Sequence, residues 1–128
     1  MKTIKYELAK KLYDTGTVIE SETSFFFENN EWEEGIYIWK SEKKDQIGDL
    51  WFSQKICPAP NCEEVIEFLS DIKIDNFHLS IDFCSWLTIV NYRSSGSVLF
   101  PYIEEPTLLE ALEATLEYLL DNWFLWKQ

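Results

Sequence analysis

The sequence predicts an α+β protein, with an antiparallel sheet of about five to six strands and three helices packed mainly on one face of it. Apolar residues recur at helical spacing in three segments, and short aromatic and β-branched runs lie between them. The runs are joined by short turns, which favours antiparallel pairing. Because no linker or low-complexity tract divides the chain, residues 1–128 are expected to form a single globular domain.

The first predicted helix follows Thr3, whose hydroxyl can cap it. Its apolar residues Ile4, Leu8 and Leu12 recur every four positions, and Gly16 is placed to end it.

Two aromatic runs then predict a hairpin. Residues 24–28 (SFFFE) and 35–40 (GIYIWK) are rich in aromatic and β-branched side chains. The polar residues 29–34 between them predict a long loop.

A third strand is expected at residues 50–53, after a charged turn at 41–49. Pro58 and Pro60 end it, and Asn61 with Glu64 forms a capping box for a second helix. That helix is expected to run through Ile72 and to bury Val65, Phe68, Leu69 and Ile72.

The second half of the chain predicts further strands and a last helix. Residues 77–84 alternate between apolar and polar side chains, and strands are also expected at 86–92 and 98–102, around a turn at 93–96. Thr107 and Glu110 form a second capping box for a helix over residues 108–122. Its buried residues are expected to be Leu109, Leu112, Leu116, Leu119 and Leu120.

The chain is strongly acidic, with a net charge of -12. Residues 56–128 carry twelve Asp and Glu against three Lys and Arg, whereas residues 1–55 carry eleven against eight. Binding to phosphate groups depends on clustered Lys and Arg, so nucleic acid and anionic membranes are excluded as direct ligands. A protein partner with a basic surface fits this charge.

The cellular setting is expected to be the cytoplasm. The N-terminal residues 1–7 enter a charged amphipathic pattern and contain no apolar stretch of signal-peptide length. Cys57, Cys62 and Cys84 are an odd number of cysteines, and free thiols in a reducing compartment are the expected state.

The last predicted helix carries a stripe of acidic side chains and no basic residue. Like charges three and four positions apart each cost about 0.2–0.5 kcal/mol, so the stability of the helix alone does not explain the stripe. The sequence leaves two readings open, an interaction surface or a solvated face. The acidic stripe consists of Glu110, Glu113, Glu117 and Asp121.

Tryptophans supply the other candidate interaction residues. Trp32 precedes Glu33 and Glu34 in the predicted hairpin loop, and an aromatic anchor with a charged rim is typical of interface hot spots. Trp39 and Trp51 are instead expected in the core. The C-terminal run that contains Trp123 and Trp126 is consistent with docking on the domain, with a homodimer and with insertion into a partner's groove.

Familiar catalytic signatures are absent from the sequence, which contains no phosphate-binding glycine loop, no G-x-S-x-G and no H-E-x-x-H. His78 is the only histidine and is expected on the polar face of a strand. His78 and Cys84 would lie about 20 Å apart along that strand, and Cys57 and Cys62 lack the short C-x-x-C spacing. We therefore expect no enzyme activity, no metal and no cofactor.

Four segments of the chain resemble small uncharacterised proteins of bacterial phages, prophages and other mobile elements. The resemblance rests on ELAKKLYDTG, on FFFEN, on a Pro-containing entry to EEVIEFL, and on EPTLLEALEATLEYLLDN. It carries over no catalytic or binding residue. It implies a genomic setting in which small acidic proteins act on other proteins.

The function expected from the sequence is that of a small acidic, non-enzymatic protein–protein interaction module. Its sharper form is an inhibitor or immunity-type protein whose carboxylates occupy a basic groove on the target. The alternative is a small-ligand-binding domain that uses an aromatic sheet face as its pocket.

Overall fold

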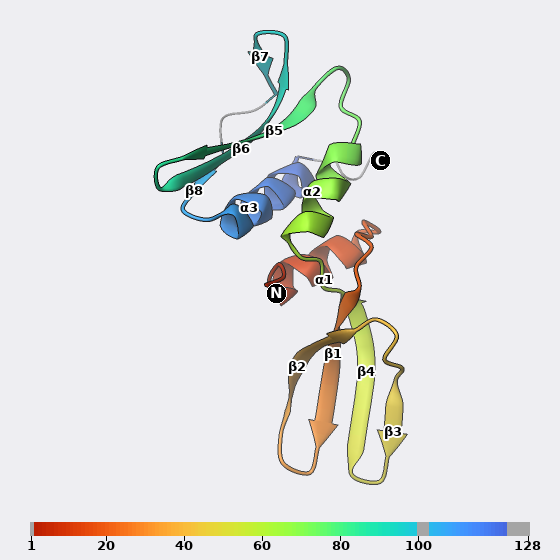
Figure 1. The fold of residues 1–128 in the computed structure, drawn as a ribbon. Coiled ribbons are helices and arrows are strands. Elements are labelled where there is room, and N and C mark those ends of the chain that lie inside the picture. Colours follow the sequence, from red (N-terminus) through yellow and green to blue (C-terminus); the bar gives the residue numbers. More distant parts are fainter. Residues whose placement is uncertain (1, 100–102, 123–128) are drawn as a thin grey trace.

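The computed structural model describes residues 2–99 and 103–122 and confirms the α+β class. The strands of this part of the chain form two antiparallel sheets of four strands each, whereas the sequence predicted one larger sheet. The three helices lie in a layer between the two sheets (Figure 1). Strands on opposite sides of a helical layer cannot share hydrogen bonds, and for this reason the single sheet divides into two.

The first sheet contains the four strands that precede the second helix. Its spatial order is β2-β1-β4-β3. The strands are β1 (Thr23–Asn30), β2 (Glu34–Lys40), β3 (Gln46–Gly48) and β4 (Trp51–Pro58).

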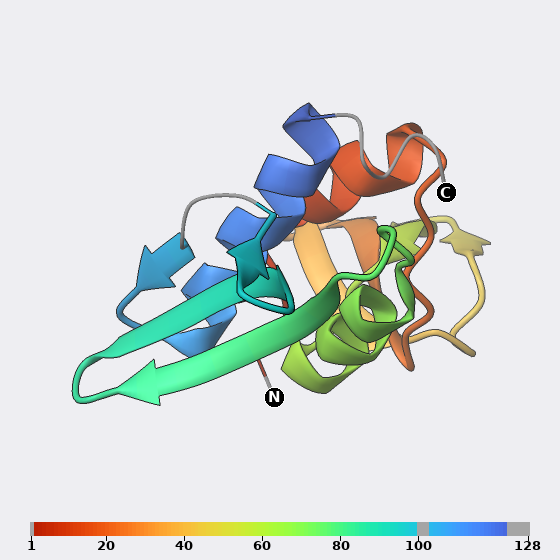
Figure 2. The same ribbon diagram turned by 90° about the horizontal axis from the view of Figure 1, so that it is seen from above.

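The second sheet is built around β6, which pairs with β5, β7 and β8. Seen from above, the long β5–β6 hairpin crosses over the last helix (Figure 2). The strands are β5 (His78–Cys84), β6 (Leu87–Ser94), β7 (Ser97–Val98) and β8 (Ile103–Glu105). Of the strand predicted at 98–102, Val98 lies in β7 and Leu99 lies outside any strand, and residues 100–102 lie outside the described residues.

The helical layer holds the molecule together through α3 (Leu108–Asp121), which packs against β6, β8, α1 (Tyr6–Asp14) and α2 (Cys62–Asp71). The apolar face predicted for α3 is buried, except that Leu109 is only partly covered. The Tyr92 hydroxyl on β6 donates a hydrogen bond of 2.8 Å to the Leu69 carbonyl oxygen on α2, and burial raises the pKa of Tyr92. The largest fully buried side chains of the core include Ile4, Val65, Leu69, Tyr92, Leu112, Leu116 and Leu119.

The helix ends confirm two of the three predicted caps. The capping box of α2 is present: the Glu64 amide donates to Asn61 Oδ1 at 3.0 Å, and the Asn61 amide donates to Glu64 Oε1 at 2.9 Å. Thr107 caps α3 through the Glu110 amide at 3.1 Å, but only this half of the predicted capping box is present, because the Glu110 carboxylate accepts from the Thr107 hydroxyl. The cap predicted at Thr3 is wrong, because α1 begins three residues later and Thr3 forms an isolated bridge with Asn61.

The first sheet projects away from the helices and contacts them only at its base. There the Tyr6 ring of α1 meets Phe25 edge to face, with ring centroids 5.3 Å apart. Cys57 lies beside Phe25 in the register and is buried. The outer half of the sheet therefore has to be stabilised by its own residues.

A segment between β2 and β3, residues 41–45, crosses one face of this sheet, and we call it the strap. At one end the Ser41 amide donates to the Glu22 carbonyl oxygen at 2.8 Å. At the other end Asp45 Oδ1 accepts from the Lys55 amide at 2.6 Å.

Lys43 of the strap fills the centre of that face. Its ammonium nitrogen lies 4.0 Å from the ring centroid of Trp39, 5.3 Å from that of Trp51 and 5.6 Å from that of Phe26. It also pairs with the carboxylate of Glu28, whose residue is only 8% exposed. The prediction that Trp39 and Trp51 are core residues is wrong, since they are 43% and 36% exposed and form the sides of a cation site.

We expect Lys43→Ala to destabilise the fold by roughly 2–4 kcal/mol, because it leaves a buried carboxylate without its cation. Lys44→Ala, at the exposed neighbouring position, is the matched control and should cost less than about 0.5 kcal/mol. Urea unfolding followed by tryptophan fluorescence measures both. Adding Glu28→Gln to Lys43→Ala should recover part of the loss. Equal stability of the two alanine variants would contradict this assignment.

The Cys57 thiol is expected to resist alkylation in the folded protein. Burial raises the pKa of its thiol to about 11. The folded state favours the neutral form of the Cys57 thiol, and this preference stabilises the fold. The stabilisation is complete below the ordinary thiol pKa and is lost as the pH rises toward 11. At pH 8, alkylation mapped by mass spectrometry should label the exposed Cys84 quickly and Cys57 only after unfolding. Equal labelling rates of Cys57 and Cys84 in the folded protein would contradict this expectation.

Candidate functional site

Two of the three most exposed apolar side chains of the first sheet lie at its far end, which we call the sheet tip, and the third, Ile47, lies on β3. The sheet tip consists of the β1–β2 turn (residues 31–33) and the β3–β4 turn (residues 49–50). The two turns lie next to each other because Asn30 pairs with Trp51 in the register, and Figure 1 shows them at the end farthest from the helices.

Trp32 is 84% exposed in the first turn of the sheet tip, and Leu50 in the second turn is 66% exposed. The turn that carries Trp32 is tight, which corrects the long loop predicted over residues 29–34. Asn30 Oδ1 accepts the amide of Trp32 at 2.8 Å and that of Glu33 at 3.0 Å. These bonds hold the turn, so Trp32 is presented on ordered backbone.

The chemistry of the sheet tip is apolar at the centre and acidic around it. Glu31, Glu33 and Asp49 lie in its turns, and residues 29–39 and 47–54 contain no Lys or Arg. Beside the turns lies an open depression of about 290 Å³.

Glu33 and Glu34 differ in what they contact. The Tyr37 hydroxyl donates to Glu33 Oε1 at 2.6 Å, and this hydrogen bond raises the pKa of Tyr37. Glu34 is exposed at the start of β2. The structure places Trp32, Glu33 and Glu34 at the tip and adds Asp49, which lay in the predicted turn 41–49, and Leu50, which was predicted to be in a strand and lies in the β3–β4 turn.

The acidic stripe of α3 has a structural role that the sequence did not reveal. The Lys5 backbone amide donates to Glu113 Oε2 at 2.8 Å, and the Lys5 ammonium lies 3.1 Å from Glu117 Oε1. The Lys11 ammonium lies 3.2 Å from Asp121 Oδ1. These contacts connect α3 to the start and end of α1.

The remaining member of the stripe acts within its own helix, because Glu110 Oε1 accepts from the Thr107 hydroxyl at 3.1 Å as part of the cap. The hydrogen bond and charge of Glu117 raise the pKa of Lys5. The lysines that compensate the stripe lie more than a hundred positions earlier in the sequence, so no local pattern could indicate them.

The second sheet exposes an aromatic pair that the sequence did not single out. Phe83 is 71% exposed and Trp86 is 80% exposed at the β5–β6 turn. Phe83 was expected on the buried face, but the hairpin extends past α3 and nothing in the described residues covers that end of it. An open depression of about 390 Å³, which Pro106 also lines, lies beside Trp86. Trp123 and Trp126 lie outside the described residues.

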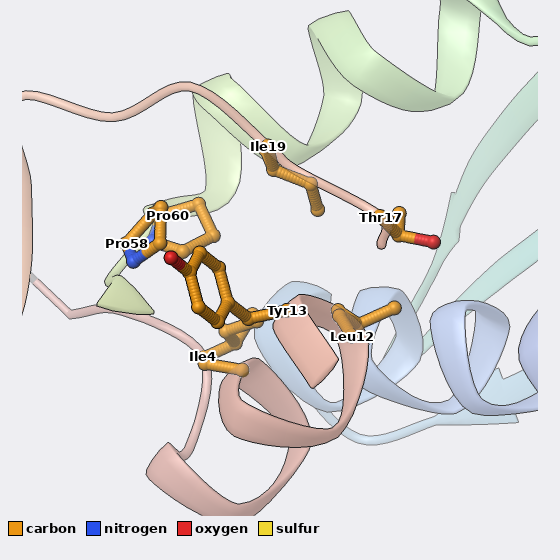
Figure 3. Close-up of a pocket in the computed structure, with 8 residues that line it drawn as sticks. Ile4, Leu12, Tyr13, Thr17, Ile19, Pro58 and Pro60 are labelled. Carbon is orange, nitrogen blue, oxygen red and sulfur yellow. The ribbon is translucent and has the colours of Figure 1, made fainter. Parts of the chain in front are cut away.

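The structure offers little space for an enclosed small ligand. The aromatic face of the first sheet is occupied by Lys43. Figure 3 shows an apolar pocket, where Tyr13 lies against Pro58 and Pro60. Its volume is about 10 Å³, which is close to that of a single water position.

Within residues 2–99 and 103–122, no three His, Cys, Asp or Glu side chains are placed to hold a metal ion. His78 and Cys84 stand at opposite ends of β5. None of the described helices is long and apolar enough to cross a membrane.

Comparisons with known proteins identify no relative for this arrangement. A scan against protein-family models, a search of curated proteins and a search of solved structures each returned no match.

We expect Lys5 and Glu117 to be energetically coupled through the docking of α1 on α3. Both side chains are about half exposed (53% and 43%), so a double-mutant cycle of Lys5→Ala and Glu117→Gln should give about 0.2–1 kcal/mol at low salt. The coupling should fall at 1 M salt, where charges are screened within about 3 Å. The pair Lys10–Asp14, within α1, is the control for a local ion pair. Zero coupling at low salt would argue against this docking contact.

Proposed function

We propose that this protein is a non-enzymatic protein–protein interaction module that binds its partner through the sheet tip. The observation that carries the proposal is the 84% exposure of Trp32 on a turn held by the Asn30 side chain. Exposing so large a ring to water is unfavourable, and covering it with a partner removes that cost.

The sheet tip is well suited to recognition because little of it has to be ordered on binding. Side-chain and loop ordering costs about 0.5–1.5 kcal/mol for each immobilised side chain, and tryptophan has only two side-chain torsions. The two hydrogen bonds that Asn30 Oδ1 accepts order the backbone of the turn before a partner binds. The tip also stands away from the helices, so a partner can surround it (Figure 1).

The partner is a protein with a basic surface and an apolar recess. Glu31, Glu33 and Asp49 lie in the two turns of the tip, and acidic residues near a contact surface speed and orient association with a basic partner. Within this proposal the protein is an inhibitor or immunity-type protein of the cytoplasm. The resemblance to proteins of phages and mobile elements supports the role of inhibitor or immunity-type protein. The three unpaired cysteines support the cytoplasmic setting.

The sheet tip replaces the acidic stripe as the principal contact surface in this proposal. Glu113, Glu117 and Asp121 already contact α1, so reversing their charges would disturb the fold as well as any binding. They are unsuitable as probes of recognition. Substitutions at the tip avoid this difficulty because Trp32 and Leu50 are mostly exposed.

The test is quantitative capture from a lysate of the source cell, with the full chain as bait. A specific partner should be enriched by the wild-type protein and should fall by about 30-fold with Trp32→Ala/Leu50→Ala, the loss expected for a hot-spot tryptophan. It should also weaken at high salt. Trp86→Ala is the matched control, since that ring is 80% exposed on the other sheet and should leave capture unchanged.

Two results would overturn the proposal. Retention of the partner by the tip variant would remove the tip from the interface, and loss with Trp86→Ala would move the interface to the β5–β6 turn. Absence of any specific partner at both salt concentrations, with folded bait, would remove the interaction function itself. Circular dichroism of each bait establishes that it is folded.

A further inference from the structure

The outer edge of β2 is open and long. β2 is the last strand in the order β2-β1-β4-β3, so within the described residues its outer side pairs with no strand. It has seven residues, contains no proline, and exposes Ile36 and Ile38, which are 39% and 45% exposed. Proteins usually protect such an edge with prolines, bulges, inward charges or a cover. The opposite edge strand, β3, has only three residues.

The hydrogen bonds of the hairpin determine which residues of β2 face outward. The Asn30 amide donates to the Glu33 carbonyl oxygen at 3.0 Å, so Asn30 and Glu33 form a hydrogen-bonded pair. Such pairs recur at every second residue, so the backbone groups of Gly35, Tyr37 and Trp39 point toward β1. The backbone N–H and C=O groups of Ile36 and Ile38, which lie between these residues, therefore point to the open edge.

The sequence of this edge is complementary to itself. If β2 is set antiparallel to a second β2 with Tyr37 at the centre, Ile36 stands opposite Ile38 of the other copy. Glu34 then stands opposite Lys40 of the other copy, which brings together opposite charges at both ends of the strand. Each outward-facing isoleucine meets an outward-facing isoleucine, so this register also satisfies the hydrogen-bond alternation at the centre of the strand. At its end the Lys40 carbonyl oxygen also accepts the Lys43 amide of its own chain at 3.0 Å.

One face of such a pair of strands is also matched. A two-fold axis perpendicular to the sheet keeps each face on the same side, so four isoleucine side chains join one apolar strip beside Phe27. On the other face Gly35 stands opposite Trp39 of the second copy, and the Tyr37 ring of its own chain already lies over Gly35, 3.4 Å from the position of a Cβ. A shift of the register by two residues would set Glu34 opposite an isoleucine.

We infer that β2 is a self-association edge: two copies of this chain pair antiparallel through residues 34–40, about a two-fold axis at Tyr37. The pairing joins the two first sheets into one continuous sheet and places the two sheet tips at opposite ends of it. A dimer would therefore present two Trp32 anchors to a partner. This inference rests on the edge of β2 alone and does not depend on the proposed function.

Sedimentation of the full chain across a range of concentrations tests the inference, with a charge exchange as the specific probe. Glu34→Lys alone sets Lys opposite Lys40, and Lys40→Glu alone sets Glu opposite Glu34. Each of these like-charge pairs occurs twice in the dimer, so each single variant should raise the dimer dissociation constant about tenfold. The double variant Glu34→Lys/Lys40→Glu should return it to near the wild-type value. Ile47→Lys, on the opposite edge strand, should have no effect.

A crosslink tests the register independently of affinity. Facing residues in a non-hydrogen-bonded pair have Cα atoms about 4.5 Å apart, within the range that a disulfide spans. In a Cys84→Ser background, which removes the exposed cysteine, Tyr37→Cys should form a disulfide dimer under mild oxidation, and Ile47→Cys should not.

Each measurement has an outcome that overturns the inference. Monomeric wild-type protein at every concentration rules out self-association and leaves the edge to a strand of another protein. A dimer that is indifferent to the charge exchange and lacks the Tyr37→Cys crosslink uses another surface. Circular dichroism identifies any variant that has lost its fold, and the restored double variant distinguishes loss of pairing from loss of structure.

Discussion

Burial of the apolar face of α3 is the interaction on which the rest of the structure depends. Leu112, Leu116 and Leu119 are fully buried, and the helix that carries them contacts both other helices and the second sheet. The carboxylates beside this face then direct α1, because Glu113 and Glu117 meet Lys5 at the start of that helix. Burial supplies most of the free energy in this arrangement, and the half-exposed ion pairs contribute mainly orientation.

The first sheet is subject to a different constraint, because it reaches beyond the helical layer. Its outer half cannot be covered by helices, so the strap closes one face with Lys43 between aromatic rings and beside Glu28. A hydrogen-bonded, charge-balanced cluster takes the place of an aliphatic core there. The other face, the edge and the tip stay accessible, and these are the surfaces from which the proposals arise.

The two proposals use different parts of the same sheet and have different physical origins. Recognition at the tip rests on an exposed ring on ordered backbone, with an acidic rim. Self-association at β2 rests on unpaired backbone groups whose side chains happen to be complementary about Tyr37. A sheet that extends from a stable body can provide both, since neither surface is needed to fill the core.

The sequence by itself determined the α+β class, the three helices and two of their caps, because periodicity and capping are local properties of neighbouring residues. It also predicted an interaction site at Trp32, Glu33 and Glu34, and this stays a prediction. Only the tertiary structure decided the division into two sheets, the pairing of the acidic stripe with α1, and the cation site around Lys43. These features join residues far apart in the chain, and the spacing of residues along a sequence carries no information about which distant charge will meet which.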